Sequence, residues 1–175
     1  MNRRYSTFSC LLFIVVGLAF TIFAQASAQA GCKCPILNGS QMAFVGCKPN
    51  EALSTTIARA KQGNPKALYI LGRLYELGGK TFGLPQIKWS NALAERYYLE
   101  SARRGYVQAQ AAIGWMYGKY RAGQKRGQSQ FWFCKAAEQY NDAAIVNIRD
   151  EINYERSKKT WQEYCKPILK KGEPK

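Results

Sequence analysis

Cysteines are the residues of this chain whose type and spacing come nearest to a chemical site. Beyond residue 30 the sequence contains Cys32, Cys34, Cys47, Cys134 and Cys165. One residue separates Cys32 from Cys34, whereas redox and zinc sites use Cys-x-x-Cys spacing, and the chain has no histidine to complete a metal shell. We therefore expect structural disulfides, and neither a metal nor a cofactor.

Several disulfide pairings are compatible with these positions. Cys134 lies in a predicted helix and Cys165 in the C-terminal segment, so this pair could staple the last helix to the rest of the fold. Cys47 could close a small loop with Cys32 or Cys34, and one thiol would then be left over. This use of cysteine indicates an oxidising compartment.

Catalytic groups are missing from the sequence. Without histidine there is no Ser-His or Cys-His pair, and the carboxylates are few, with Glu95 and Glu100 spaced as on a solvated helix face. The run Gly78-Gly79-Lys80-Thr81 ends like a phosphate-binding loop but lacks the upstream glycine and the preceding strand, so we expect a helix-terminating turn there. The sequence predicts a protein that is not an enzyme.

The sequence contains a repeat with a period of forty-two residues, and this repeat predicts the helices that position the candidate residues. Residues 67–75 (ALYILGRLY) are echoed by residues 109–117 (AQAAIGWMY), and each block is followed by a second helical stripe. These second stripes are Ala94, Tyr97, Tyr98 and Ala102, then Trp132, Phe133, Ala136 and Ala137. A helix pair that recurs at about this period is typical of an α-solenoid, a scaffold that mostly binds partners.

A glycine stands at the same place in both blocks, at Gly72 and Gly114. Glycine inside a helix costs about 1 kcal/mol relative to alanine. Its recurrence therefore predicts a packing reason, namely the close approach of the following helix with its bulky Tyr97 and Tyr98.

These residues carry a family resemblance. The pattern Ala-x-x-x-Leu-Gly-x-x-Tyr-x-x-Gly at 67–78, followed by the stripe from Ala94 to Gly105, resembles a Sel-one-like repeat, a longer relative of the tetratricopeptide repeat. The second copy matches except that Tyr120 and Tyr140 replace the expected glycines, and residues 80–90 lengthen the first repeat. The resemblance covers residues 50–148. It implies an all-α fold, a short α-solenoid of antiparallel helix pairs with about two full repeats.

Partial repeats flank the two full ones and predict capping helices. Residues 50–62 align with the second helix of a pair, and residues 142–152 begin a third first-type helix with Ala144 in place. Arg149 stands where that helix should carry glycine, which indicates the end of the stack. Trp161 and Tyr164 are expected to pack back on the solenoid beside Cys165, so residues 149–175 form a C-terminal capping helix and a basic tail.

The N-terminus has the features of a signal peptide. Arg3 and Arg4 precede the apolar run 11–23, and small residues offer cleavage sites near Ala28 or Ala30. We expect residues 1–30 to be removed on export, with residues 31–49 forming a cysteine-containing N-terminal segment. A periplasmic location in a bacterial envelope is favoured; a membrane-anchored or an extracellular protein is the alternative.

The mature chain is strongly basic. Loss of residues 1–30 removes two of the 26 basic residues and none of the 11 acidic ones, which leaves a net charge of +13. Export argues against nucleic acid as the partner. The charge favours a protein with an acidic surface or an anionic envelope surface, and the oligomeric state stays open.

Two positions after the repeated glycines are candidates for partner binding. Arg73 and Trp115 lie off the core stripe, so both are expected to face outward. An exposed Trp115 would form an aromatic and basic patch with its basic neighbours, the kind that anchors protein interfaces. Alternatively Trp115 packs under the 121–128 loop or the C-terminal helix. The full set of partner-binding candidates is Arg73, Trp115, Lys119, Arg121, Lys125 and Arg126.

The function expected from these features is that of an exported, non-enzymatic scaffold or adaptor for protein–protein interactions in the bacterial envelope. The family resemblance also implies a second possibility, an immunity protein that neutralises a secreted toxin. A third possibility is an electrostatic binder of anionic envelope surfaces, whose affinity would collapse as salt is raised.

Overall fold

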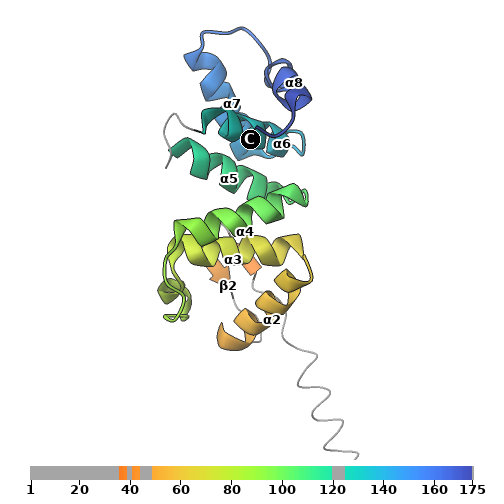
Figure 1. Cartoon of the computed structure of the whole chain (residues 1–175). Coiled ribbons are helices and arrows are strands. Elements are labelled where there is room, and N and C mark those ends of the chain that lie inside the picture. Colours follow the sequence, from red (N-terminus) through yellow and green to blue (C-terminus); the bar gives the residue numbers. More distant parts are fainter. Residues whose placement is uncertain (1–35, 39–40, 44–48, 120–124, 175) are drawn as a thin grey trace, which may run out of the picture.

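The computed structural model describes residues 36–38, 41–43, 49–119 and 125–174, and Figure 1 shows this part of the chain as a stack of helices. Its helices are α2 (Pro49–Lys61), α3 (Pro65–Leu77), α4 (Asn91–Arg103), α5 (Val107–Lys119), α6 (Arg126–Ala137), α7 (Asp142–Tyr154) and α8 (Trp161–Lys171). Consecutive helices pack against each other, most extensively α3 with α4 and α5 with α6. The predicted all-α solenoid is confirmed: two full helix pairs are flanked by α2 and by α7 and α8.

A short hairpin precedes the helices. Its strands β1 (Ile36–Asn38) and β2 (Gln41–Ala43) pair antiparallel, with Ile36 opposite Ala43. The repeat pattern begins near residue 50 and contains no signal for these strands. The proposed signal peptide, Tyr120, Arg121 and the three cysteines Cys32, Cys34 and Cys47 lie outside the described residues.

The repeated glycines let an aromatic ring of the paired helix lie directly against the helix backbone. A Cβ atom on Gly72 would lie 2.5 Å from Cδ1 of Tyr98, and one on Gly114 would lie 2.9 Å from Cδ1 of Phe133. Tyr98 is fully buried and Phe133 nearly so. The packing reason predicted for the two glycines is confirmed.

The turns that follow α2, α4 and α6 share one backbone geometry. Each contains a residue with positive φ, namely Gly63 (78°), Gly105 (84°) and Tyr140 (57°). The next amide donates to the carbonyl five residues earlier, as Asn141 N does to Ala136 O at 3.2 Å. Tyr140 thus preserves the turn in place of the expected glycine, at a cost of roughly 1–2 kcal/mol.

Helix α7 starts as α3 does, which supports its assignment as a third first-type helix. The side chains of Asn64 and Asn141 accept hydrogen bonds from the amides of Ala67 and Ala144, at 3.0 and 2.9 Å. Arg149, at the position of the missing glycine, is exposed, and α8 packs more on α6 than on α7. That Arg149 marks the end of the stack stays a prediction.

The long connection between α3 and α4 is a folded part of the core. Helix α3 ends at Leu77 with Gly78 as its C-cap, and the 3₁₀ helix η1 (Gly79–Phe82) follows. Phe82 and Leu84 are buried with the α3 residues, and Gly79 N donates to Ile87 O at 2.9 Å. The glycines at 78 and 79 form a helix-terminating turn, as expected.

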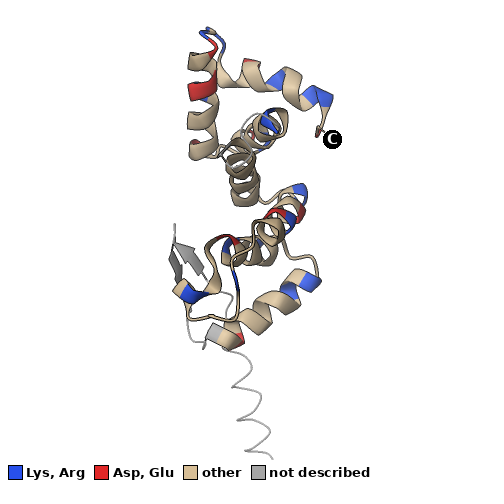
Figure 2. Ribbon diagram, turned by 60° about the vertical axis from the view of Figure 1, so that its left-hand side comes forward, with Lys and Arg blue, Asp and Glu red and all other residues tan. Residues whose placement is uncertain are grey.

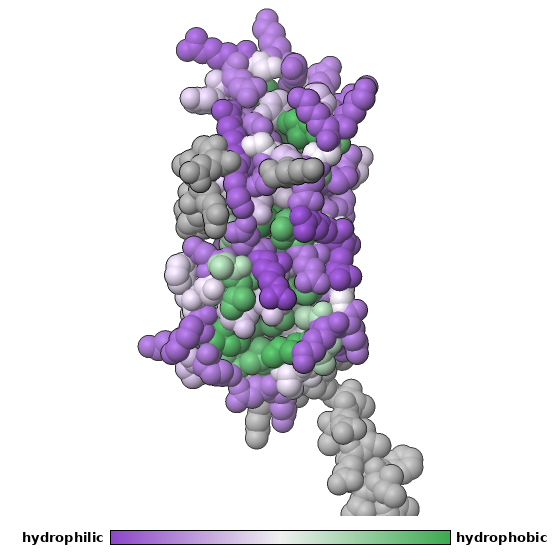
Figure 3. Space-filling view, in the orientation of Figure 1, coloured by the Kyte–Doolittle hydropathy of each residue, from purple (hydrophilic) through white to green (hydrophobic). Residues whose placement is uncertain are grey.

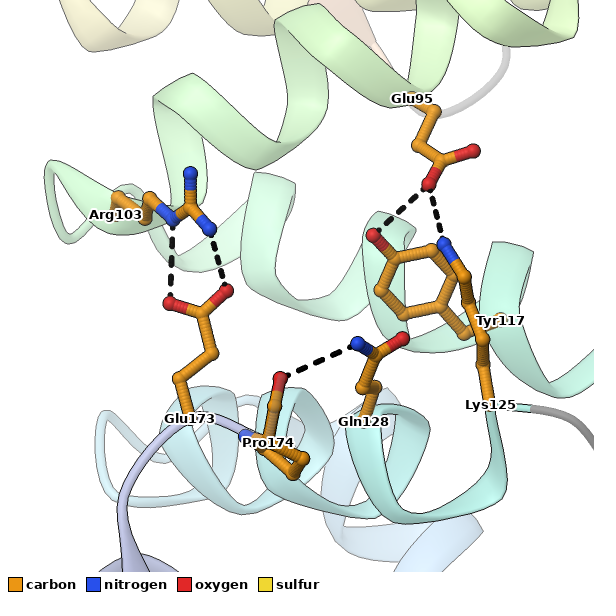
Figure 4. Close-up of polar contacts among 7 residues, drawn as sticks. All are labelled: Glu95, Arg103, Tyr117, Lys125, Gln128, Glu173 and Pro174. Carbon is orange, nitrogen blue, oxygen red and sulfur yellow. Dashed lines mark hydrogen bonds and ion pairs between the residues drawn. The ribbon is translucent and has the colours of Figure 1, made fainter.

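Helix α8 is tied back onto the stack by a disulfide and by the chain that follows it. Cys134 of α6 and Cys165 of α8 form a disulfide with a Cα–Cα distance of 5.4 Å, and Tyr164 is buried beside it. Beyond α8, the Glu173 carboxylate accepts from Nη2 and Nε of Arg103 on α4 at 2.8 and 3.2 Å. Figure 4 shows this pair beside the bond from Gln128 to the Pro174 carbonyl. The C-terminal residues therefore connect α8 to the first full repeat.

The surface of the stack is mainly hydrophilic on the face that Figure 3 shows, with apolar residues in separate patches. No helix in the described part of the chain is long and apolar enough to cross a membrane.

Candidate functional site

A groove of about 670 Å³ opens between α5, α6, α7 and α8. Each of these helices contributes an aromatic side chain to its lining: Trp115, Phe133, Tyr154 and Tyr164, in that order. Trp115 is 49% exposed and Tyr154 is 80% exposed, whereas the other two rings are buried. The groove thus offers apolar surface that a partner can reach.

Trp115 owes its position to the glycine before it. Phe133 fills the space that the missing side chain of Gly114 leaves. The Trp115 ring meets Phe133 at right angles, with ring centroids 5.8 Å apart and an angle of 86° between the planes. One side of the indole is therefore held by a buried ring while about half of the residue stays open to solvent. Of the two environments considered from the sequence, the exposed one is found among the described residues.

Arg126, the first residue of α6, lies at the edge of the groove. Its Nε donates to Oε1 of Glu151 at 2.7 Å, its Nη2 also bonds that oxygen, and Nη2 lies 3.4 Å from Oε1 of Glu155. The hydrogen bond to Glu151, together with its charge, raises the pKa of Arg126. The guanidinium that the sequence offered as a binding group is thus engaged within the molecule.

Gln130 and Tyr164 extend this polar edge into the groove. Nε2 of Gln130 donates to Oε1 of Glu151 at 3.1 Å and to Oη of Tyr164 at 2.8 Å. Burial, followed by the charges of Glu155 and Glu151, raises the pKa of Tyr164 to about 12. Tyr164 is therefore neutral near pH 7 and acts as a hydrogen-bonding wall of the groove.

Lys125 precedes Arg126 in the chain but belongs to a different contact. Its Nζ lies 2.7 Å from Oε1 of Glu95 on α4 and 4.3 Å from the centroid of the Tyr117 ring. Oη of Tyr117 donates to the same carboxylate oxygen at 3.1 Å, as Figure 4 shows. Burial and the Glu95 carboxylate raise the pKa of Tyr117. Glu95, expected on a solvated face, instead links α4 to α5 and to the start of α6.

Arg73 occupies the position in α3 that Trp115 occupies in α5, yet its side chain is only 19% exposed. Its Nη1 donates to Oε2 of Glu76 at 2.8 Å, and Oη of Tyr98 donates to the same oxygen at 2.6 Å. The expectation that Arg73 faces outward differs from the structure, because the buried Tyr98 draws Glu76 and Arg73 against the α3–α4 interface.

Of the six partner-binding candidates, Trp115 and Arg126 meet at the groove, whereas Lys125 and Arg73 are engaged elsewhere. The side chain of Lys119 and the whole of Arg121 lie outside the described residues. Sequence reasoning missed Tyr154 and Glu151 as groove residues, and also Glu155, which contacts the groove residue Arg126. The available signal was the four-residue spacing of Glu151 and Glu155, which share one helix face if the helix predicted to begin over residues 142–152 continues.

The described residues contain no group of three or more histidine, cysteine, aspartate or glutamate side chains that could hold a metal ion. The groove offers aromatic surface, one ion-paired arginine and neutral hydrogen-bonding groups. This arrangement is suited to holding a ligand.

Comparison with known proteins supports the fold. No protein-family model matches the sequence, and none of the curated proteins matches it. Among solved structures, the chain is similar to a protective antigen present in uropathogenic Escherichia coli strains, whose crystal structure displays an SLR (Sel-one-like repeat) fold. The TM-score is 0.52 and the sequence identity 29%, over 66% of this chain and 24% of the antigen. The chain therefore has an α-solenoid fold of the Sel-one-like type, and the matched part of it spans about a quarter of that longer protein.

Proposed function

We propose that this chain is an exported, non-enzymatic scaffold for protein–protein interactions in the bacterial envelope, and that its partner docks in the groove around Trp115. The observation that carries the proposal is a tryptophan 49% exposed in a groove of about 670 Å³. Tryptophan is among the residues that contribute most to protein interfaces when it becomes buried there. The Sel-one-like fold supports the proposal, because such repeats generally bind other proteins.

Export is supported by the sequence of residues 1–30 and by the disulfide between Cys134 and Cys165, since disulfides persist in oxidising compartments. We place the mature protein in the periplasm, with cleavage near Ala28 or Ala30. The intact mass of the protein recovered from its own envelope tests this placement, and a chain that still carries Met1 would contradict it.

The experiment that tests docking is a pull-down of the tagged mature protein from its own envelope, washed at low and at high salt. Trp115→Ala should lose the partner, whereas Trp89→Ala should retain it, because Trp89 is 63% exposed but lies in the connection before α4. Circular dichroism checks that both variants are folded. Equal retention by both would refute docking at the groove.

The partner retained at high salt separates the detailed roles. An envelope protein would establish an adaptor, and a secreted toxin would establish an immunity protein. Material that is lost as salt rises and is unaffected by Trp115→Ala would mean that the net charge of +13 acts alone on an anionic surface.

A further inference from the structure

At the Arg126 edge of the groove, the described side chains carry more negative than positive charge, although the chain as a whole is strongly basic. Glu151 and Glu155, one turn apart at the end of α7, both lie against the single guanidinium of Arg126. Their side chains are 30% and 42% exposed, so both carboxylates can be reached from solvent. Within the described residues, this cluster thus contains two carboxylates and one guanidinium.

The C-terminal end of α7 adds to this negative field, whereas the N-terminal end of α6, where Arg126 stands, opposes it. Helix α7 ends at Tyr154, and the C-terminal end of a helix carries about half a negative charge, which favours a nearby cation. Glu151 and Glu155 stand at this negative end, where their own charges are disfavoured. Figure 2 shows acidic residues, in red, at this end of α7. A cation placed beside them would relieve that repulsion.

The basic residues nearest to this end of α7 do not line the groove. Lys158 and Lys159 line a separate pocket with Trp161, on the side of α7 that also carries Arg149. Arg156 follows Glu155 in the turn and is exposed. Among the lining residues that the structure describes, Arg126 supplies the only positive charge.

Aromatic rings stand beside the two carboxylates. Trp115 and Tyr154 line the groove together with Glu151 and are the two lining aromatic residues that are open to solvent. The face of an aromatic ring attracts a cation, by about 0.5–1 kcal/mol at exposed sites and more when water is excluded. A planar guanidinium can stack on such a ring and bond a carboxylate at the same time.

We propose that the groove receives an arginine side chain carried by an extended segment of the partner protein. The guanidinium stacks on Trp115 or Tyr154 and bonds the Glu155 carboxylate, which Arg126 holds only at 3.4 Å. This rests on the proposed docking function and specifies the partner's chemistry. A partner drawn by the basic surface must be acidic overall, so an arginine at the docking point makes recognition selective among acidic proteins.

The test is selection of peptides from a displayed library of random sequences by the full mature protein. Peptides that bind the wild type and are lost with Trp115→Ala should be enriched in arginine next to an apolar residue. Glu155→Gln should weaken a selected, fluorescently labelled peptide by about five- to tenfold, which corresponds to about 1–1.4 kcal/mol. Glu155→Lys should remove the preference for arginine.

Glu138→Gln is the matched control, because Glu138 is also an exposed ion-paired glutamate, bound to Lys135 at 2.9 Å on α6. It should leave peptide binding unchanged. Trp115-dependent peptides that lack arginine, or that are enriched in acidic residues, would overturn the inference while leaving docking at the groove intact. Peptides that do not depend on Trp115, or no selected peptide at all, would overturn both proposals.

Discussion

Replacing single glycines by alanine tests how the helix pairs fit together. In a helix this change gains up to about 1 kcal/mol of stability when the new methyl group meets nothing, because alanine is the better helix former. Gly127, in the first turn of α6, has no atom within 4 Å of a built Cβ. Gly127→Ala should therefore stabilise the protein by up to about 1 kcal/mol.

At Gly72 the same change should destabilise. The new Cβ would lie 2.5 Å from the Tyr98 ring, roughly 1 Å inside an ordinary carbon–carbon contact. The ring cannot retreat, because Tyr98 is 0% exposed and its hydroxyl is bonded to Glu76. Overpacking of this kind costs about 1–3 kcal/mol, so the net loss after the gain in helix propensity is about 1–2 kcal/mol.

Gly114→Ala should fall between these two variants. Its Cβ would lie 2.9 Å from the ring of Phe133, which is 8% exposed and has no hydroxyl to anchor it. Equilibrium urea unfolding followed by circular dichroism measures all three free energies of unfolding. If Gly72→Ala were as stable as Gly127→Ala, the close approach of Tyr98 would not be what maintains glycine at this position.

Three further predictions concern the disulfide, the strained turn and the buried tyrosines. Replacing both Cys134 and Cys165 by alanine opens a loop of 31 residues, which should lower the free energy of unfolding by about 3–4 kcal/mol. Calorimetry should then show a fall in Tm of about 7–15 °C. An unchanged Tm would show that the disulfide does not stabilise the fold. Tyr140→Gly should raise the free energy of unfolding, measured in urea, by about 1 kcal/mol, because glycine adopts positive φ without strain. A lower free energy of unfolding would mean that the exposed Tyr140 ring makes a stabilising contact. Burial raises the pKa of Tyr98 and that of Tyr164, the latter to about 12. The stability that these two neutral tyrosines contribute to the fold is therefore complete below the unfolded-state pKa of about 10. It is lost as the pH rises through the folded-state pKa values. The part of the phenolate absorbance that comes from Tyr98 and Tyr164, identified by its loss in Tyr98→Phe and Tyr164→Phe variants, should therefore appear only as the helices unfold above about pH 10. Ionisation of these two tyrosines while the helices remain intact would contradict it.

The helices of the stack could be predicted because each repeat contains, within its own sequence, the residues that pack its two helices together. Gly72 and Gly114, spaced alike and followed by aromatic residues at matching positions, indicate which helix faces meet before any coordinates are known. Tyr140 shows the limit of that pattern: its side chain departs from the repeat, yet the turn is kept because the hydrogen bonds of the neighbouring amides outweigh the strain at one residue.

The groove was harder to predict because it depends on pairs of residues far apart in sequence. Trp115 could be identified as exposed from its place off the core stripe, but its charged surroundings could not. Arg126 and Lys125 are neighbours in the chain, yet α6 begins between them, so one faces Glu151 and the other faces Glu95. The basic patch inferred from the adjacent Lys125 and Arg126 therefore does not form, because the start of α6 directs the two side chains to different partners.

The return of the C-terminal residues to α4 has a consequence for the order in which the molecule can fold. Repeat proteins generally fold by propagation from one repeat to the next, so N-terminal helices can fold while C-terminal helices are still being synthesised. Here Arg103 of α4 bonds Glu173, which lies seventy residues later in the chain, and α6 forms its disulfide with Cys165 of α8. Contacts of such sequence separation slow folding. The described stack is therefore complete only after Cys165 and Glu173 have been synthesised, and until then α4 and α6 lack the contacts that join them to these C-terminal residues.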